Sequence, residues 1–226
     1  MKITVYQSKG SAGKTPIATN IALDREYAVG TNERFHVFEG FIPDERLLAV
    51  DLSEPFPAIP DDIDIVFDLA GAISKTSHSI TSAIAQSDLV IVPIYNEVKS
   101  LTGGVGTLRE VYPLNTSIVV VATKLRKQKG EIFSDDWTMS RDYQNIRTHV
   151  DSTCRHLGVK QPFPVLPLKQ SNVFDVIFEE ETSIRGLMQN SGLAAYTYRD
   201  VARQFDAIYN TIDGMTHAAE KQPLCA

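Results

Sequence analysis

The sequence predicts an α/β protein with three layers, in which a mostly parallel, twisted sheet is flanked by helices on both faces. Short β-branched or apolar runs, each bounded by turn residues, alternate with longer segments of helical spacing. The clearest strands are apolar almost throughout, which is typical of parallel strands buried on both faces. A short apolar start leads directly into a loop of small residues and lysines.

The expected elements follow from these patterns. The expected strands are 3–6, 47–50, 63–68, 88–93, 117–123 and 164–168. The expected helices are 15–26, 77–86, 101–111, 142–157 and 199–214. In the last helix, Val201, Phe205 and Ile208 recur at helical spacing, so this stripe is expected to pack on the core rather than on a membrane. We expect a single domain over residues 1–218 and a frayed tail over 219–226.

The loop after the first strand has the residue types of a phosphate-binding loop. It reads Lys9-Gly10-Ser11-Ala12-Gly13-Lys14-Thr15, followed by Pro16. Gly10 and Gly13 tolerate positive φ and carry no side chain that would block a ligand, so backbone N–H groups can turn inward around phosphates. Lys14 then reaches the outer phosphates, and the Thr15 hydroxyl can ligate Mg²⁺. All eight residues are predicted to bind a nucleoside triphosphate, the alternative being a surface turn with solvated lysines.

The loop departs from the plain P-loop signature at one position, where Ser8 stands in place of glycine. A second lysine at the start of the loop, Lys9, fits a variant better. The loop resembles the deviant P-loop of the ParA/MinD superfamily, whose common form is Lys-Gly-Gly-x-Gly-Lys-Thr, and differs from it only at Ser11. The resemblance implies an ATPase that binds ATP with Mg²⁺ and forms a homodimer on ATP binding. It also implies that Lys9 reaches across the dimer interface to the phosphates held by the partner subunit.

A P-loop needs a carboxylate at the end of a neighbouring parallel strand, where it holds Mg²⁺ directly or through water. Asp68 meets this need, because it ends the segment Asp64-Ile65-Val66-Phe67 and precedes a turn of small residues. The next expected strand begins with a Ser-Asp pair and ends in proline, as it does in the same family. We therefore predict Lys9, Lys14 and Asp68 as catalytic residues and Thr15 and Asp68 as metal ligands. A turn-capping role is the alternative for Asp68.

One part of the family pattern is missing. The family places an Asp-x-Asp-Pro segment after its second strand, and one of these aspartates positions the attacking water. The corresponding stretch is 27–33, with Gly30 and Asn32 where the two carboxylates would fall. An amide can orient water but cannot take its proton, so hydrolysis is expected to be slow or to depend on a partner. Glu33 and Asp51 are both open as replacement carboxylates.

Residues at the ends of two later strands are expected near the base. The resemblance places Thr123, Lys124, Pro167 and Leu168 beside the adenine, and the sequence does not decide between ATP and GTP. Four of the six residues from 124 to 129 are basic, and these could contact DNA phosphates nonspecifically, with a solvated loop as the alternative. The basic residues are Lys124, Arg126, Lys127 and Lys129.

Composition and charge limit the partners and the cellular location that can be expected. The net charge of −6 disfavours a protein that coats nucleic acid over its whole surface but leaves room for a local basic patch. No run of about 18 apolar residues is present, and the chain starts with an expected strand rather than a signal peptide. We expect a cytoplasmic protein that does not bind membranes, with nucleoid association if it binds DNA.

Three further features carry no predicted chemistry. Cys154 and Cys225 have neither disulfide-framework nor zinc-site spacing. The acids within 172–184 are expected at a solvated helix end. The glycines of 103–106 lack a following lysine and are expected to serve close packing or a flexible helix start rather than a second phosphate loop.

The resemblance implies a function in partition or positioning of plasmid or other mobile DNA, through a DNA-binding adaptor of the centromere-binding type. A nucleotide-gated scaffold or regulator with little hydrolysis is the second possibility, supported by Gly30 and Asn32. A metabolic P-loop ligase or kinase is the third, although no dedicated substrate motif is present. A MinD-like membrane role is weaker, because the chain lacks a basic amphipathic ending.

Overall fold

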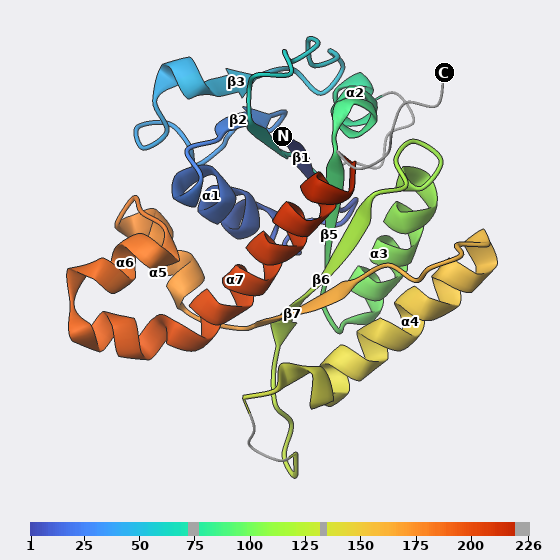
Figure 1. Cartoon of the computed structure of the whole chain (residues 1–226), viewed down its shortest axis with the longest axis vertical. Coiled ribbons are helices and arrows are strands. Elements are labelled where there is room, and N and C mark those ends of the chain that lie inside the picture. Colours follow the sequence, from blue (N-terminus) through green and yellow to red (C-terminus); the bar gives the residue numbers. More distant parts are fainter. Residues whose placement is uncertain (72–76, 132–134, 220–226) are drawn as a thin grey trace.

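The computed structural model describes residues 1–71, 77–131 and 135–219, which fold around one seven-stranded sheet (Figure 1). The strands are β1 Lys2–Val5, β2 Ala28–Thr31, β3 Leu47–Ala49, β4 Ile65–Asp68, β5 Leu89–Ile94, β6 Ile118–Leu125 and β7 Val165–Lys169. Their order in the sheet is β3-β2-β4-β1-β5-β6-β7, and each adjacent pair is parallel. The carboxyl end of β1 therefore opens at the centre of the sheet edge where ligands bind in folds of this kind.

Helices cover both faces of the sheet. They are α1 Lys14–Asp24, α2 His78–Gln86, α3 Val98–Val111, α4 Arg141–Leu157, α5 Val173–Glu179, α6 Ile184–Asn190 and α7 Gly192–Ala219. Single turns of 3₁₀-helix occur at Asp44–Arg46 and Trp137–Met139. The helices α1, α5, α6 and α7 pack on one face, and α2, α3 and α4 pack on the other. This arrangement confirms the predicted three-layer α/β fold.

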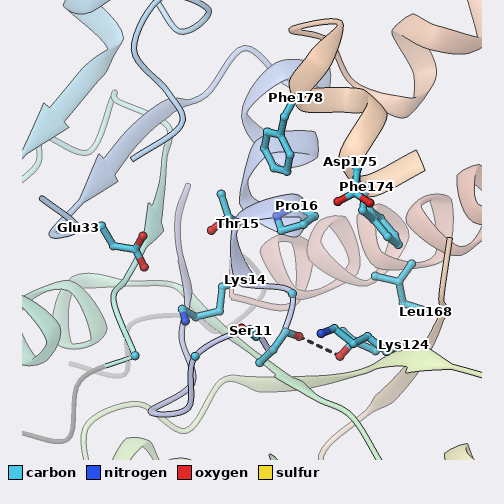
Figure 2. Close-up of a pocket in the computed structure, with 15 residues that line it drawn as sticks. Ser11, Lys14, Thr15, Pro16, Glu33, Lys124, Leu168, Phe174, Asp175 and Phe178 are labelled. Carbon is cyan, nitrogen blue, oxygen red and sulfur yellow. Dashed lines mark hydrogen bonds between the residues drawn. The ribbon is translucent and has the colours of Figure 1, made fainter. Parts of the chain in front are cut away.

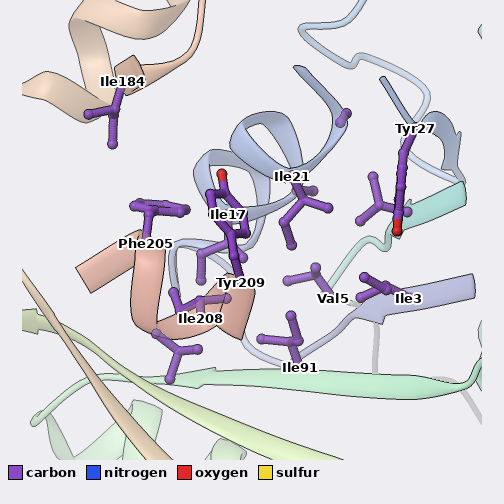
Figure 3. Close-up of a cluster of buried hydrophobic side chains, with 14 of the residues drawn as sticks. Ile3, Val5, Ile17, Ile21, Tyr27, Ile91, Ile184, Phe205, Ile208 and Tyr209 are labelled. Carbon is purple, nitrogen blue, oxygen red and sulfur yellow. The ribbon is translucent and has the colours of Figure 1, made fainter. Parts of the chain in front are cut away.

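Burial on both faces explains why the strands are apolar almost throughout. Successive side chains of a strand point to opposite faces. Val66 of β4 packs toward α1 and α7, whereas Phe67 packs toward α2, and both are fully buried. Figure 3 shows the first of these clusters, in which Phe205 of α7 lies beside Ile17 of α1, and Ile21 of α1 lies above Val5 of β1.

A polar network fixes α1, the helix that begins at the phosphate loop, to the C-terminal helices. The buried hydroxyl of Tyr209 lies 2.7 Å from the Asp24 carboxylate and 3.1 Å from the Asn20 carbonyl oxygen. The Asn20 side-chain oxygen accepts a hydrogen bond from the Ile184 N–H group at 2.9 Å. Arg25 forms an ion pair with Asp213 of α7 at 2.7 Å. These contacts hold α1 in place beneath the loop.

The boundaries of several elements differ from the predicted ones. The strand predicted over 63–68 begins at Ile65, because Ile63 lies before the sheet and is 42% exposed. The last helix begins at Gly192 rather than at 199, since exposed side chains in its first turns hide the apolar stripe. β2, α5 and α6 were not predicted as separate elements because they are only four to seven residues long. Most of the tail predicted over 219–226 lies outside the described residues.

The structure bears on two expectations drawn from composition, which concern membrane-spanning segments and the cysteines. Among the described residues, no helix combines the length and the apolar character that a membrane crossing requires. Cys154 of α4 is buried in the core, and burial raises the pKa of its thiol. Cys225 lies outside the described residues.

Gly30, at the position of the first missing carboxylate, lies in β2 against the core. A Cβ atom on Gly30 would lie 2.5 Å from a ring carbon of Phe67 and 3.2 Å from one of Phe56. These two rings pack edge to face, with their centroids 4.8 Å apart. The Phe67 ring therefore fills the space that a side chain at position 30 would need.

We expect Gly30→Ala to lower the free energy of unfolding by about 1–3 kcal/mol, because the new methyl group must displace Phe67. Gly106→Ala is the matched control: Gly106 lies within α3, and a Cβ there meets no atom within 4 Å. That substitution should stabilise the protein by roughly 0.5–1 kcal/mol through helix propensity. Urea unfolding of both variants measures the difference, and an unchanged Gly30→Ala midpoint would contradict this packing.

Candidate nucleotide site

The predicted phosphate loop joins β1 to α1 at the centre of the sheet. Ser11 and Gly13 adopt left-handed conformations, with φ of 61° and 89°. Gly13 is the N-cap of α1, where no side chain caps the helix and no acidic residue occupies the first turn. The N–H groups and dipole of a helix start attract anions, and nothing in this turn competes for them.

The loop is held from two neighbouring elements. The Ser8 N–H group donates a hydrogen bond to the Thr107 hydroxyl of α3 at 3.1 Å. A Cβ on Gly103 of the same helix would lie 3.2 Å from Lys9, so this glycine serves close packing, one of the two expected roles. On the other side, the Thr123 hydroxyl at the end of β6 donates to the Ala12 carbonyl oxygen at 2.9 Å.

A cavity of about 420 Å³ opens over the loop (Figure 2). Its size lies within the range of roughly 300–1,000 Å³ that is usual for small-molecule sites. The lining residues are Gly10, Ser11, Ala12, Gly13, Lys14, Thr15, Pro16, Glu33, Gly71, Thr123, Lys124, Leu168, Phe174, Asp175 and Phe178. Most of the predicted nucleotide-binding residues are therefore brought together around one cavity.

Lys14 supplies a buried positive charge at this cavity. It is only 5% exposed. Burial lowers the pKa of its amine, and the negative charges of Asp68 and Glu33 oppose that shift. A desolvated ammonium group gains most from an anionic ligand, and a polyphosphate chain fits this need.

Asp68 supplies a carboxylate suited to a metal ion. Val5 and Asp68 lie opposite each other where β1 and β4 end. Asp68 is 1% exposed, and its Oδ1 atom has no hydrogen-bond partner among the described residues. Burial raises the pKa of the carboxyl group to about 7, although the Thr15 hydroxyl and Lys14 act to lower it. An unpaired buried carboxylate oxygen beside a hydroxyl is a donor set that Mg²⁺ prefers.

Only a few side chains at this site could hold a metal ion, so other ligands would have to complete its coordination. Among the described residues, no group of three or more His, Cys, Asp or Glu side chains could hold a metal. Mg²⁺ usually keeps several waters and shares one or two carboxylates with substrate phosphates. Thr15 and Asp68 fit this kind of site, in which a nucleotide supplies further ligands.

The end of the cavity away from Lys14 is apolar and aromatic. Leu168 of β7 lines it, together with Phe174, Asp175 and Phe178 of α5. Sequence reasoning missed the three α5 residues; the only signal was a pair of phenylalanines four residues apart in a short segment. Pro167 does not line this cavity. It lines a second one, together with Trp137 and residues of α7.

Of Lys9 and the four residues of the basic run, only Lys124 lines the cavity. The Lys9 side chain does not line the cavity of its own chain. Lys124 lines it and places its ammonium 4.7 Å from the Tyr95 ring centroid, and that of Lys127 lies 5.1 Å from the Trp137 ring. The Arg126 guanidinium donates a hydrogen bond to Gln170. The fourth basic residue, Lys129, is exposed.

Asn32, at the position of the second missing carboxylate, links β2 to two other segments. Its side-chain NH₂ donates to the Ser79 hydroxyl at 2.8 Å, and its oxygen accepts from the Ala70 N–H group at 2.7 Å. The next residue, Gly71, packs against the phosphate loop, since a Cβ there would lie 2.9 Å from the Gly10 nitrogen. Asn32 therefore fixes the turn that follows Asp68.

Comparisons with solved structures show that this fold is shared with McdA and MinD. Apo McdA from Cyanothece has a TM-score of 0.64 at 12% identity, covering 93% of this chain and 98% of McdA. The cell division ATPase MinD from Pyrococcus furiosus has a TM-score of 0.56 at 12% identity, covering 92% and 99%. MinD from Pyrococcus horikoshii, complexed with Mg-ADP, has the same TM-score and identity, covering 92% and 96%. No protein-family model and no curated protein sequence matches the chain. At this level of identity the comparisons show a shared fold, as the resemblance of the loop predicts.

We expect Asp68→Asn to stabilise the metal-free protein more at pH 8 than at pH 5. The folded-state pKa of Asp68 is raised to about 7 from 3.8, so the folded state loses stability as pH rises through this range. Asparagine stays neutral at both pH values. The free energy of unfolding of the variant, relative to that of the wild type, should therefore be roughly 2–4 kcal/mol higher at pH 8 than at pH 5. Urea unfolding of both proteins in EDTA at pH 5 and pH 8 measures this difference.

Asp61→Asn is the control, because this carboxylate is exposed and its hydrogen bond with Lys2 lowers its pKa. Its stability difference from the wild type should stay constant between pH 5 and pH 8. An Asp68→Asn difference that also stayed constant would contradict the raised pKa.

Proposed function

We propose that this protein is a ParA/MinD-like ATPase that binds ATP with Mg²⁺, hydrolyses it slowly and dimerises in the ATP-bound state. The observation that carries the proposal is the Oδ1 atom of Asp68, which is buried beside Thr15 at the phosphate loop and has no hydrogen-bond partner among the residues that the structure describes. A buried carboxylate without a partner is costly, and a Mg²⁺ ion held with the nucleotide would offset that cost.

Each residue has a distinct role in this proposal. Lys14 and the backbone N–H groups of 10–15 bind the phosphates. Thr15 and Asp68 hold Mg²⁺, which neutralises charge on the outer phosphates. Leu168, Phe174 and Phe178 enclose the base by apolar and aromatic contact. Lys9, whose side chain does not line its own cavity, acts on the phosphates of the partner subunit.

The cellular role that we propose is the partition or positioning of plasmid or other mobile DNA. A DNA-binding adaptor of the centromere-binding type would couple the ATPase to its cargo. Support comes from the resemblance of the loop and from the fold shared with the septum site-determining protein MinD. The proposal places the protein in the cytoplasm, associated with the nucleoid when it binds DNA.

A second candidate function is a nucleotide-gated scaffold with little hydrolysis. A specific observation favours it: Phe67 fills the space beside Gly30, and both polar atoms of the Asn32 amide are engaged. Neither position can therefore supply a base without rearrangement. Binding of ATP without phosphate release would favour this scaffold over the ATPase.

We expect Lys14→Ala to weaken ATP binding by at least tenfold, because it removes the buried charge that faces the phosphates. Titration with a fluorescent ATP analogue measures binding, and phosphate release with and without duplex DNA measures turnover. Lys160→Ala, which removes an exposed lysine, is the control and should bind as the wild type does. Failure of the wild type to bind ATP would refute the proposed function.

If the basic run binds DNA, we expect affinity to fall steeply between 50 and 200 mM salt, because each neutralised phosphate releases counterions. Lys124, Arg126 and Lys127 already contact neighbouring side chains, so exposed Lys129 is the clearest residue to test. Lys129→Ala should reduce the log–log salt slope by about 1. Fluorescence anisotropy with ATP and a nonspecific duplex measures the slope, and an affinity independent of salt would exclude DNA binding here.

A further inference from the structure

Hydrolysis of a nucleoside triphosphate needs a group that positions the attacking water. We propose that the Glu33 carboxylate is this group, and that it takes the place of the carboxylate absent from positions 30 and 32. The inference rests on the proposed ATPase function and names the residue that makes the site catalytic rather than only nucleotide-binding.

Glu33 lies where such a group is required. It lies two residues beyond the end of β2, and Thr31, the last residue of that strand, lies opposite Asp68 of β4. Its side chain lines the cavity together with Lys14 and Thr15, and Figure 2 shows its carboxylate directed toward these two residues.

The charge of Glu33 acts on the two buried charged groups of the site. It raises the pKa of the Lys14 amine and that of the Asp68 carboxyl group. No hydrogen bond or ion pair occupies the Glu33 carboxylate within the part of the chain that the structure describes. The carboxylate is therefore available to a water molecule.

Asn32 cannot take this role while it keeps its present contacts. It is 5% exposed, and its amide is committed to Ser79 and Ala70 at 2.8 and 2.7 Å. The Ser79 hydroxyl in turn donates to the Leu52 carbonyl oxygen at 2.9 Å, so it accepts from Asn32. These bonds hold the end of β2 and thereby position Glu33, the next residue.

Asp51, the other carboxylate that the sequence left open, lies elsewhere. It does not line the cavity over the phosphate loop. One of its oxygens accepts hydrogen bonds from the Ser53 N–H group and hydroxyl, at 3.0 and 2.7 Å. Asp51 lines a neighbouring open cavity of about 770 Å³, which Glu33 also lines. Glu33 thus borders both spaces, and water can reach it from the second.

Hydrolysis assisted by Glu33 needs no reactant other than ATP and water. The water oxygen forms a bond to the γ-phosphorus, and the bond from that phosphorus to the β–γ bridging oxygen breaks, so ADP leaves with the electron pair. Glu33 accepts the proton of the attacking water and afterwards releases it to solvent. The products are ADP, inorganic phosphate and one proton.

The test compares Glu33→Gln with Asp51→Asn, each of which replaces a carboxylate by an amide of the same shape. Phosphate release under saturating Mg-ATP gives kcat, and calorimetric titration with Mg-ATPγS gives Kd independently of hydrolysis. Thermal unfolding with and without Mg-ATPγS shows that each variant is folded and binds nucleotide.

We expect Glu33→Gln to lower kcat at least tenfold, because its amide can orient water but cannot accept the proton. Its Kd should stay within threefold of the wild type or become tighter, since a negative charge facing the triphosphate is removed. Asp51→Asn should change kcat by less than twofold.

Any of three results in the variants would overturn the inference: a Glu33→Gln kcat like that of the wild type, an equal loss in Asp51→Asn, or loss of nucleotide binding in Glu33→Gln. A wild type that binds Mg-ATPγS but never releases phosphate from ATP would also overturn it, while leaving the proposed nucleotide binding intact. A wild type that binds neither nucleotide would instead refute the proposed function itself.

Discussion

The desolvation of two opposite charges, Lys14 and Asp68, is the constraint on which the rest of this structure depends. Both lie almost fully buried at the carboxyl edge of the sheet, where Coulomb attraction offsets only part of the cost of removing them from water. Burial shifts the pKa of each group so that its neutral form is favoured, and one Asp68 oxygen has no hydrogen-bond partner within the described part of the chain. A polyphosphate with a divalent cation would satisfy both groups at once.

The surrounding fold keeps these charges in place. The register of β1 with β4 sets Asp68 beside the start of the phosphate loop, and contacts from α3 and from Thr123 brace the loop itself. Behind it, the Asn20 and Tyr209 network joins α1 to the C-terminal helices. Asn32 ties the end of β2 to the turn after Asp68. A few hydrogen bonds therefore connect the phosphate site to β2 and α2, so that a ligand at the site can alter the positions of both elements.

The sequence predicts the parts of this site that depend on local patterns. The phosphate loop and Asp68 were predictable, because strand, loop and helix residues follow one another in the chain. The aromatic lining from α5 was not, since a seven-residue helix is too short for clear periodicity and only tertiary packing brings it over the loop. The absence of carboxylates at Gly30 and Asn32 was visible in the sequence. Their packing, and the choice of Glu33 over Asp51, required the structure.

A crystal structure with Mg²⁺ and a nonhydrolysable ATP analogue tests the central claim most directly. We expect a triphosphate surrounded by the backbone of 10–15, Mg²⁺ held by Thr15 and by Asp68 directly or through water, and the base beside Leu168 and the α5 phenylalanines. A loop that stays empty at saturating nucleotide, or a nucleotide bound elsewhere, would contradict it.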